Sequence, residues 1–358
     1  MQKSFEILSS TGAYTVAIGS GAIAHARRLA PGAIFLCDRN IESYLPADID
    51  PIFIDATEKA KSLEAMPGVI RALRARKADR GSHLVAIGGG ITQDIATFAA
   101  SVYMRGIPWT YLPTTLLGMV DSCIGGKSSI NVEEMKNLVG NFYPPGHVLV
   151  DPAFLPTLDA QDIVGGLCEA VKICFARGSV DFSSLIDAEP VPPLSPETAT
   201  RIITQSLLVK KWFIEIDEFD QKERLLLNFG HTFGHALESA TSYEIKHGVG
   251  VGIGMLVAIE FQKHLGRMSP QGSLLCDRLS DYVHKILGQV AGLAAAAKVD
   301  SATLLGHFEN DKKHRAGEYR LILPVESGAL AIVSVAKTPA MQQAIVQSYE
   351  TVLAGLGS

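Results

Sequence analysis

The chain has 358 residues, a hydrophobic fraction of 47%, a charged fraction of 19% and a formal net charge of -5 at pH 7. This length allows two domains with buried cores, and the composition excludes an intrinsically disordered chain. The negative charge argues against nucleic acid as the main partner, because phosphate backbones select basic surfaces.

The five cysteines are odd in number and include no CxxC pair, so we interpret them as reduced, buried thiols. The N-terminus has no apolar block of the kind that a signal peptide needs. The apolar stretch at residues 248–259 is too short and too rich in glycine to span a bilayer. We therefore expect a cytoplasmic protein that has no membrane partner.

The first half of the chain alternates strand-like and helix-like segments. Short apolar runs at residues 33–38, 83–90 and 109–115 resemble buried strands, and the first two end in a polar residue or in glycines. Residues 58–80 and 91–106 carry the spacing of helices. This repetition predicts a parallel sheet covered by helices.

After about Pro152 the pattern changes to helical periodicity with few strand signals. The helical segments are at residues 159–177, 197–217, 224–241 and 248–265. The sequence therefore predicts an α/β protein with an N-terminal parallel-sheet domain at residues 1–152. A mostly α-helical domain follows at residues 153–358, and we expect a ligand cleft between the two.

Three consecutive glycines at residues 88–90 lie between a predicted strand and a predicted helix. Such a turn lets the backbone approach a diphosphate, and the start of the helix supplies oriented N–H groups. A tight structural turn is an equally good interpretation of three glycines alone. The pattern is not the GxGxxG fingerprint, and the best candidate for a ribose-binding acid, Asp38, precedes the glycines.

A possible metal site is indicated by His231 and His235, which are spaced to share one face of a helix, and by His247 sixteen residues after His231. The segment HTFGH lacks the glutamate of a zinc-protease HExxH motif. Glu169 and Lys172 lie on an otherwise apolar helix, where a charge needs a partner or a metal. Two imidazoles and a carboxylate form an open catalytic site, but the spacing does not say which two histidines bind.

Basic and amide side chains are frequent at several separated points of the chain. This arrangement suits a substrate with two anionic ends, although solvated surface lysines are the usual alternative. The candidates are Arg105, Lys127, Asn131, Lys136, Asn137, Lys210, Arg224, Asn228, Lys312, Lys313 and Arg315, and the acid Asp121 lies in the same glycine-punctuated stretch as Lys127.

Taken together, these motifs resemble the 3-dehydroquinate synthase family within the sugar-phosphate cyclase superfamily. The resemblance runs in unbroken order over roughly residues 5 to 325. It is carried by DRN at 38–40, EKAKSLE at 58–64, GGGITQD at 88–94, YMRG, PTTLL at 113–117, VDSCIGGKSSIN, KNLVGNFYPP, GGLCEAVK, RLLLNFGHTFGHALE, KHG and NDKK.

The resemblance implies a dehydroquinate synthase-like fold, bound NAD and a divalent metal, Zn2+ or Co2+. It implies conversion of 3-deoxy-D-arabino-heptulosonate 7-phosphate to 3-dehydroquinate and phosphate. In that family, NAD transiently oxidises a hydroxyl, phosphate leaves by β-elimination, the ketone is reduced again, and an aldol addition closes the ring. NAD thus ends unchanged. The implied class is a carbon–oxygen lyase of the shikimate pathway of aromatic amino acid biosynthesis.

The site residues follow from the resemblance position by position. The implied metal ligands are Glu169, His231 and His247, and His235 moves toward the substrate. The implied NAD contacts are Asp38, Asn40, Glu58, Lys61, Gly89, Gly90, Asp94, Thr114, Thr115, Asp121 and Lys136. The implied substrate residues are Lys127, Asn137, Lys172, Lys210, Arg224, Asn228, His235 and one of Lys312 or Lys313.

Arg105 resembles a family arginine that reaches the phosphate of the neighbouring subunit's site, which implies a homodimer. Asn228, His235 and the GGK segment at residues 125–127 resemble the dehydroquinate synthase branch. Three places differ from the family's pattern. They are Gln93 at the start of a helix, Asp220 before the substrate arginine, and the serine pair at residues 128–129.

Three other functions fit parts of this pattern. A sister cyclase would act on another heptulose phosphate or on an amino-sugar phosphate. A metal-dependent polyol dehydrogenase would accumulate NADH and would have no use for phosphate-binding lysines. A binding or scaffold protein without catalysis would hold no divalent metal.

Overall fold

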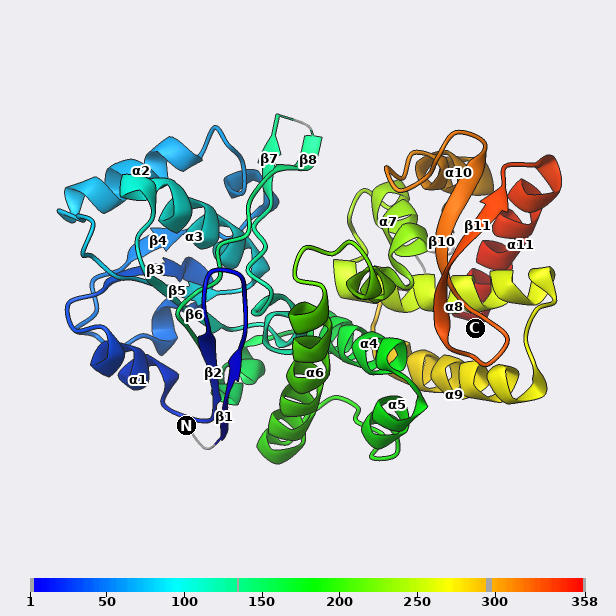
Figure 1. The fold of residues 1–358 in the computed structure, drawn as a ribbon, viewed down its shortest axis with the longest axis horizontal. Coiled ribbons are helices and arrows are strands. Elements are labelled where there is room, and N and C mark those ends of the chain that lie inside the picture. Colours follow the sequence, from blue (N-terminus) through cyan, green and yellow to red (C-terminus); the bar gives the residue numbers. More distant parts are fainter. Residues whose placement is uncertain (1–2, 134, 294–297, 357–358) are drawn as a thin grey trace. The chain divides into compact units, whose positions relative to one another are not determined.

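The computed structural model describes residues 3–133, 135–293 and 298–356. The chain forms two compact units, of which unit 1 is residues 1–158 and 195–218, and unit 2 is residues 159–194 and 219–358. Figure 1 labels the helices and strands of both units.

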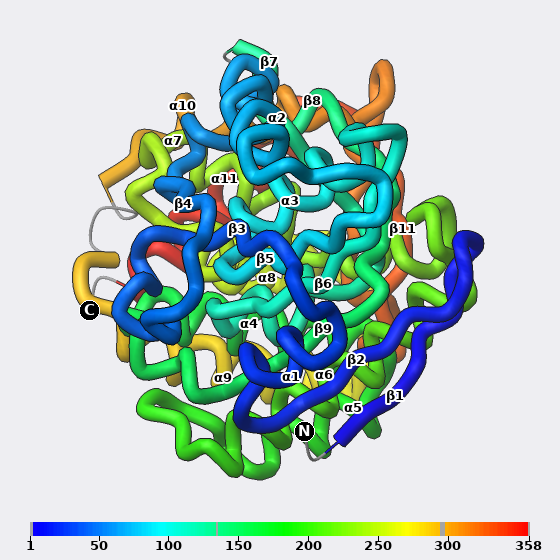
Figure 2. Tube along the Cα trace, turned by 90° about the vertical axis from the view of Figure 1, so that its left-hand side faces the viewer, coloured from blue at the N-terminus to red at the C-terminus, as the bar shows by residue number. Residues whose placement is uncertain are grey.

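Unit 1 is built around a seven-stranded sheet with the strand order β1-β2-β9-β6-β5-β3-β4, which Figure 2 shows from one side. The β1–β2 pair is antiparallel and the other pairs are parallel. Every residue of β5 and β6 is buried, which is why their sequences are continuous apolar runs. The strands are β1 (Lys3–Ile7), β2 (Tyr14–Ile18), β3 (Ile34–Asp38), β4 (Ile52–Ile54), β5 (Leu84–Gly88), β6 (Trp109–Pro113) and β9 (His147–Val150).

Helices cover this sheet, with α2 and α3 on one side and α1 on the other (Figure 1). Unit 1 also contains a small antiparallel hairpin, β7–β8. Asn131 of β7 forms backbone hydrogen bonds with Lys61 and Leu63. The remaining elements of unit 1 are α1 (Ala22–Leu29), η1 (Arg39–Tyr44), η2 (Glu58–Ala60), α2 (Met66–Ala75), α3 (Gly90–Val102), η3 (Tyr103–Arg105), η4 (Gly118–Ser122), β7 (Ile130–Val132), β8 (Met135–Val139), η5 (Pro152–Thr157) and α6 (Pro196–Ile216).

Unit 2 is mostly helical, with one antiparallel hairpin, β10–β11, among its described residues. Its centre is α8, which packs against α4, α7, α9 and α11. The elements are α4 (Ala160–Arg177), α5 (Ser179–Ile186), η6 (Glu223–Asn228), α7 (His231–Ala240), α8 (His247–Leu265), α9 (Pro270–Leu287), α10 (Ser301–Glu309), β10 (Glu318–Pro324), β11 (Leu330–Ala336) and α11 (Pro339–Leu356).

The predicted fold class, a parallel sheet followed by a mostly helical part, is confirmed. The division differs from a single boundary at residue 152, because α6 returns to unit 1. On α6, the Ser206 hydroxyl donates to the Val120 carbonyl at 2.9 Å, and the Lys210 ammonium lies 2.6 Å from an Asp121 oxygen of η4. These contacts with a distant segment decide where α6 packs, and its own periodicity does not record them.

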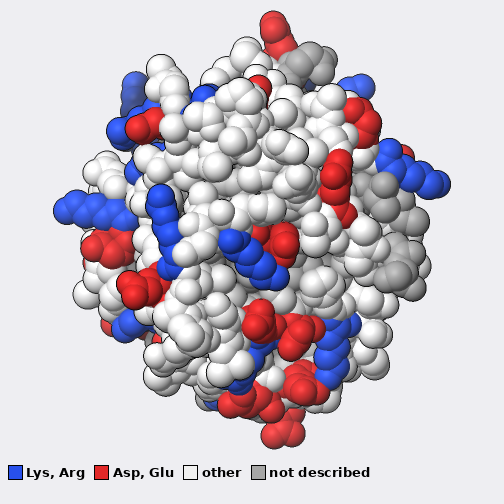
Figure 3. Space-filling view, turned by 90° about the vertical axis from the view of Figure 1, so that its right-hand side faces the viewer, with Lys and Arg blue, Asp and Glu red and all other residues white. Residues whose placement is uncertain are grey.

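Two surface features bear on possible partners. Figure 3 shows a face of unit 2 on which basic and acidic side chains are interspersed, and no continuous basic patch is visible among the described residues of that face. No helix in the described ranges combines the length and the hydropathy needed to cross a bilayer.

Candidate active site

The helices that carry the predicted metal ligands touch one another through their backbones. A Cβ atom added to Gly248 of α8 would lie 2.5 Å from the carbonyl oxygen of Gly165 in α4. A Cβ added to Gly254 would lie 2.1 Å from the carbonyl oxygen of Gly230, immediately before α7. Only glycine permits such an approach, so α4, α7 and α8 form one closely packed support.

Glu169 lies at the centre of this support and is 1% exposed. Its Oε2 atom pairs with the ammonium of Lys172, one turn further along α4 and also buried. Its Oε1 atom is buried and has no hydrogen-bond partner among the described residues. A buried carboxylate oxygen left without a partner is costly, so this atom indicates a place for a cation.

Two histidines face that oxygen. The Nε2 atoms of His231 and His247 lie 3.9 Å and 3.7 Å from Glu169 Oε1. Their other ring nitrogens are already engaged, because His231 Nδ1 lies 3.2 Å from the Phe229 carbonyl oxygen and His247 Nδ1 lies 3.0 Å from Glu238 Oε1. This leaves two Nε2 atoms within 4 Å of one carboxylate oxygen, a donor set that a metal can use.

His235 lies beside them, and one ring nitrogen from each of the three histidines falls within 4.8 Å of the others. Its ring centroid is 5.3 Å from that of His231 and 5.4 Å from that of His247. The two rings therefore lie side by side on α7, as the i,i+4 spacing of His231 and His235 in the sequence predicted. Of the three histidines, His231 and His247 are the two that lie within 4 Å of a Glu169 oxygen.

The surroundings change the pKa values of these histidines in different directions. Burial, followed by the charge of Lys172, holds the pKa of His231 well below its usual value of 6.5. Desolvation by the surrounding protein lowers the pKa of His235 to about 4, although Glu238 acts against it. For His247 the desolvation is outweighed by the hydrogen bond and the charge of Glu238, which raise its pKa. His231 and His235 are therefore neutral at pH 7, the form that binds a metal or accepts a proton.

Lys313 of unit 2 is partly exposed as a residue, but its charged end is buried. Its Nζ atom is buried and has no hydrogen-bond partner within the described ranges. Burial lowers its pKa, while Asp311 and Asp220 act in the opposite direction. The neighbouring Lys312 is exposed, so of the two candidates left open by the sequence, Lys313 has the surroundings of a ligand-binding group.

The other predicted substrate residues of unit 2 lie on η6. Arg224 is 3% exposed, and the Asn228 amide donates to the Leu225 carbonyl at 3.1 Å. Asp220 has a left-handed backbone, with φ at 60°.

Unit 1 contains the predicted cofactor loop at the carboxyl ends of its parallel strands. Strand β3 has β4 on one side and β5 on the other, so the chain changes direction across the sheet between β3 and β5. Ligands of open α/β sheets bind at such a switch point. Asp38 ends β3, and its carboxylate accepts from the backbone N–H of Asn40 at 3.0 Å. Burial raises the pKa of Asp38.

The three glycines have different roles there. A Cβ on Gly88 would lie 2.3 Å from the Thr92 hydroxyl, and a Cβ on Gly89 would lie 2.9 Å from a methyl carbon of Thr115. These two are needed for packing. A Cβ on Gly90 would meet nothing within 4 Å, so the first turn of α3 opens onto free space. Close packing therefore accounts for Gly88 and Gly89, whereas the absence of a side chain at Gly90 is not explained by packing.

Lys61 organises a polar network beside this turn. Its ammonium lies 3.0 Å from Asp94 Oδ2 and 2.9 Å from the side-chain oxygen of Asn137, with Glu58 Oε1 at 3.7 Å. Asn131 donates to Glu58 Oε1 at 2.8 Å and accepts from the Asn137 backbone N–H at 2.9 Å. Residues from four separate segments thus meet here, among them Glu58, Lys61 and Asp94 from the expected NAD contacts and Asn137 from the expected substrate residues.

The remaining predicted residues of unit 1 come from several separate segments. The segment after β6 contains Thr114, Thr115 and Asp121. Lys136 lies on β8, and the backbone of Lys127 forms an isolated β-bridge with that of Phe142. Arg105 is exposed at the end of η3. The Lys210 ammonium forms an ion pair with Asp121, so a ligand that binds this lysine would share it with that carboxylate.

Gln93, which departs from the family's pattern, lies in the first turn of α3. The Gln93 amide donates to the Ser122 carbonyl at 2.6 Å, and the Ser122 hydroxyl donates back to the Gln93 side-chain oxygen at 2.7 Å. The side chain is therefore turned into the protein. Nearby, the backbone N–H of Ser129 donates to Asp94 at 3.0 Å, a contact that any residue type could make.

Glu238 is a residue of this centre that the sequence reasoning missed. It lies three residues after His235 on α7, and its i,i+3 spacing from a candidate histidine could have indicated it. Asp311, whose oxygen accepts from the backbone N–H of Lys313 at 2.9 Å, was missed as well.

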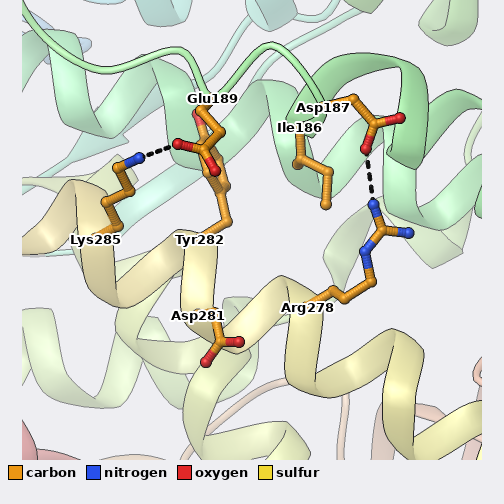
Figure 4. A pocket seen from close by; sticks show the side chains of 7 residues that line it. All are labelled: Ile186, Asp187, Glu189, Arg278, Asp281, Tyr282 and Lys285. Atoms are coloured by element: carbon orange, nitrogen blue, oxygen red, sulfur yellow. Dashed lines mark hydrogen bonds and ion pairs between the residues drawn. The ribbon is translucent and has the colours of Figure 1, made fainter.

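A separate hollow of about 480 Å³ lies elsewhere on unit 2, between α9 and the segment after α5 (Figure 4). Ion pairs join Asp187 to Arg278 at 2.8 Å and Glu189 to Lys285 across it. These two pairs compensate four of its five charged side chains, the fifth being Asp281, and none of the predicted site residues lines it.

Two family descriptions match consecutive parts of the chain. The family description "3-dehydroquinate synthase N-terminal" matches residues 51–165, and "3-dehydroquinate synthase C-terminal" matches residues 166–314. The chain belongs to the 3-dehydroquinate synthase family. The resemblance predicted from the motifs is therefore confirmed. The protein is an enzyme of this cyclase family.

Individual relatives agree with this. The chain is 38% identical over 285 residues to a 3-dehydroquinate synthase of Dictyoglomus turgidum, which covers 79% of this chain and 78% of the relative. It is 37% identical over 279 residues to one of Mycobacterium leprae, covering 77% of this chain and 75% of the relative.

Solved structures show the same fold at lower identity. A 2-deoxy-scyllo-inosose synthase complexed with carbaglucose-6-phosphate, NAD+ and Co2+ has a TM-score of 0.85 at 22% identity, covering 98% of this chain and 99% of that one. A 2-epi-5-epi-valiolone synthase from Streptomyces hygroscopicus subsp. jinggangensis 5008, with NAD+ and Zn2+ bound, has a TM-score of 0.77 at 26% identity, covering 95% and 96%.

Proposed function

We propose that this protein is a 3-dehydroquinate synthase, which converts 3-deoxy-D-arabino-heptulosonate 7-phosphate to 3-dehydroquinate and phosphate. The family membership supports this activity, and so do the names of the relatives at 38% and 37% identity. The single observation that carries it is the buried Glu169 Oε1 atom, which no described residue contacts by a hydrogen bond and which two histidine Nε2 atoms face.

The donor set fits a divalent metal of the Zn2+ or Co2+ type, because a carboxylate and two imidazoles are ligands that both ions accept. We propose Glu169, His231 and His247 as the ligands. A metal bound there polarises substrate oxygens and stabilises negative charge that develops on them. Lys172 holds Glu169 Oε2, which leaves Oε1 for the metal.

The switch point between β3 and β5 fits a dinucleotide, since Asp38 ends one strand and the open first turn of α3 follows the other. NAD bound there supplies a hydride acceptor that becomes the donor in the return step. The proposed contacts are Asp38, Asn40, Glu58, Lys61, Gly89, Gly90, Asp94, Thr114, Thr115, Asp121 and Lys136.

The chain's own polar groups serve the anionic substrate in this proposal. Lys313, whose ammonium is buried and lacks a hydrogen-bond partner in the described ranges, binds a phosphate or carboxylate oxygen. His235, neutral at pH 7, accepts a proton or a hydrogen bond from the substrate. Arg224 and Asn228 of unit 2, and Lys127, Asn137 and Lys210 of unit 1, are the other proposed substrate residues.

Two features of the proposal concern the protein's surroundings. Arg105 is exposed and adopts a left-handed backbone with φ at 67°, and we propose that it reaches the site of a second copy in a homodimer. All five cysteines are free and buried, which suits a reducing compartment such as the cytoplasm.

The proposal is tested by incubating the full chain with NAD, Zn2+ or Co2+, and each of three phosphates. These are 3-deoxy-D-arabino-heptulosonate 7-phosphate, sedoheptulose 7-phosphate and glucose 6-phosphate, with the products identified by mass spectrometry. We expect 3-dehydroquinate from the first substrate alone. A carbocycle formed only from one of the other two would identify a sister cyclase and overturn the proposal.

The metal part has a matched pair of variants in the same helix. His247→Ala removes a proposed ligand, whereas His264→Ala changes a histidine in the last turn of α8. We expect His247→Ala to abolish product formation and His264→Ala to retain it. Equal activity of the two variants would contradict the proposed ligand set.

A further inference from the structure

Glu238 makes a contact that none of the proposed roles accounts for. Its Oε1 atom lies 3.0 Å from Nδ1 of His247, nine residues further along the chain. The same histidine directs its Nε2 atom at Glu169 Oε1, 3.7 Å away. The two nitrogens of one ring therefore have carboxylates on opposite sides, one of them a proposed metal ligand and the other not.

The position of Glu238 is enforced by its surroundings. Its side chain is only 10% exposed, which is costly for a carboxylate that is not paired. The space that it occupies is left by a glycine, because a Cβ added to Gly250 of α8 would lie 2.9 Å from Glu238 Cγ and 3.0 Å from its Oε1. Helix α8 thus contributes His247 and, one turn later, the space for the carboxylate that contacts it.

The other proposed histidine ligand has a different partner. His231 Nδ1 faces the backbone carbonyl of Phe229 at 3.2 Å, which is a neutral acceptor fixed by the main chain. Only His247, among the two, has a charged side chain behind it, and that side chain can be removed by mutation. A carboxylate that accepts Nδ1–H fixes the tautomer of the ring and makes Nε2 a stronger ligand.

We infer that Glu238 is a positioning residue for metal binding: its carboxylate accepts the Nδ1–H of His247 and keeps the Nε2 lone pair directed at Glu169 Oε1. The inference rests on the proposed function, since it concerns the metal that His247 binds there. A purely structural role for Glu238 is the alternative, and it predicts a loss of stability without a change in metal affinity.

The test is a direct measurement of metal affinity on the full-length, NAD-loaded chain. Zn2+ affinity is measured by competition with a chromogenic chelator, and Co2+ binding by its visible absorption bands. We expect Glu238→Ala to weaken Zn2+ binding by roughly 10–100-fold. Glu238→Gln keeps an acceptor oxygen but loses the charge, and we expect an intermediate loss.

The matched control is Glu260→Ala. Glu260 is also on α8, but it pairs with Lys263 at 2.8 Å, and among the described residues no hydrogen bond or ion pair joins it to His231 or His247. We expect its Zn2+ affinity to equal that of the unaltered chain. Equal affinities of Glu238→Ala and Glu260→Ala would overturn the inference.

A second comparison separates positioning from folding. In a His247→Ala background the ring is gone, so Glu238→Ala should cause no further loss of Zn2+ affinity. A further loss as large as that in the unaltered chain would show that Glu238 acts on the fold and would overturn the inference. If the unaltered chain binds Zn2+ and releases phosphate while Glu238→Ala binds equally well, only this inference fails. If the unaltered chain binds no metal, the proposed function fails with it.

Discussion

Glu169 and Lys172 lie one helical turn apart on α4, and their side chains are 1% and 2% exposed. Neither charge is accessible to water, so each depends on the other for most of its stabilisation in the absence of a ligand. Breaking such a pair by removing one partner typically costs about 3–5 kcal/mol, because an uncompensated charge stays buried. A metal on the free oxygen of Glu169 would supply part of that compensation.

We therefore expect Lys172→Met to lower the free energy of unfolding of the metal-free protein by about 3–5 kcal/mol, and by less when Zn2+ is present. Urea denaturation with and without Zn2+ measures this. The control is Lys263→Met, which breaks an exposed pair with Glu260 and should change the stability by no more than about 1 kcal/mol. Equal losses for Lys172→Met with and without Zn2+ would contradict a metal at Glu169.

The buried carboxyl group of Asp94 should make the folding stability depend on pH. Burial raises its pKa from 3.8 to about 6, although the charge and hydrogen bond of Lys61 act in the opposite direction. An acid whose pKa is raised by folding contributes stability that is complete below pH 3.8 and is lost as the pH rises through about 6. The size of this contribution is up to about 3 kcal/mol.

Asp94→Asn removes this titration. Between pH 4 and pH 7 we expect the unaltered chain to lose stability relative to Asp94→Asn, and above about pH 7 the difference should be constant. Urea denaturation at a series of pH values in that range measures the difference. Parallel curves for the two proteins would show that Asp94 keeps its ordinary pKa in the folded state.

Sequence reasoning at the residue scale succeeded where a residue type was out of place. A carboxylate on an apolar helix pointed to Glu169, and the structure gives it an unpartnered oxygen. The same reasoning could not separate Lys312 from Lys313, because adjacent residues differ in burial only through tertiary packing. It missed Glu238 because a glutamate in the last turns of an amphipathic helix is usually solvated.

At the scale of elements, the glycines of α8 decide how the metal-binding helices meet. The segment GVGVGIG places a glycine at every second residue, a spacing that alone suggests a strand. In a helix it creates two glycine faces, each with an i,i+4 pair. Gly248 and Gly252 face Gly165 and Cys168 of α4, whereas Gly250 and Gly254 face Glu238 and Gly230 on the side of α7.

Gly254→Ala tests this packing. Its Cβ would lie 2.1 Å from the Gly230 carbonyl oxygen and 2.6 Å from the Gly234 nitrogen, and both are backbone atoms that cannot rotate away. We expect a loss of about 1–3 kcal/mol or more in the free energy of unfolding, measured by urea denaturation, together with weaker Zn2+ binding.

The matched control is Gly306→Ala in α10, where an added Cβ meets nothing within 4 Å. Alanine is the better helix former, so this variant should be as stable as the unaltered chain or more stable by up to about 1 kcal/mol. Equal effects of the two variants would mean that α7 and α8 are not packed through Gly254.

The elements of the sheet were predictable because buried parallel strands are short apolar runs, and β3, β5 and β6 have that form. The assignment of α6 to unit 1 could not be predicted from the sequence. Its sequence gives the length of a helix, but the contacts of Ser206 and Lys210 with η4 assign it to unit 1. Such long-range partners leave no local pattern.

For the whole molecule, the two units divide the proposed ligands between them. The residues proposed for NAD lie in unit 1, and Glu169, His231 and His247 lie in unit 2. A ligand stabilises the residues that bind it, so each ligand should slow hydrogen exchange mainly in its own unit.

Hydrogen exchange with peptide mass spectrometry measures this. We expect Zn2+ to protect peptides from α4, α7 and α8, and NAD to protect peptides that include residues 58–63 and 84–94. Protection of the unit 2 helices by NAD alone, with no effect of Zn2+, would contradict the assignment of the metal to Glu169 and its histidines.

The central claim is that this chain eliminates phosphate while NAD returns to its starting state. The most direct test records free phosphate and NADH absorbance together while the full chain, with Zn2+ and NAD, consumes 3-deoxy-D-arabino-heptulosonate 7-phosphate. The account predicts one phosphate for each substrate consumed and no net NADH. NADH formed in proportion to substrate, with no phosphate released, would show a polyol dehydrogenase and contradict it.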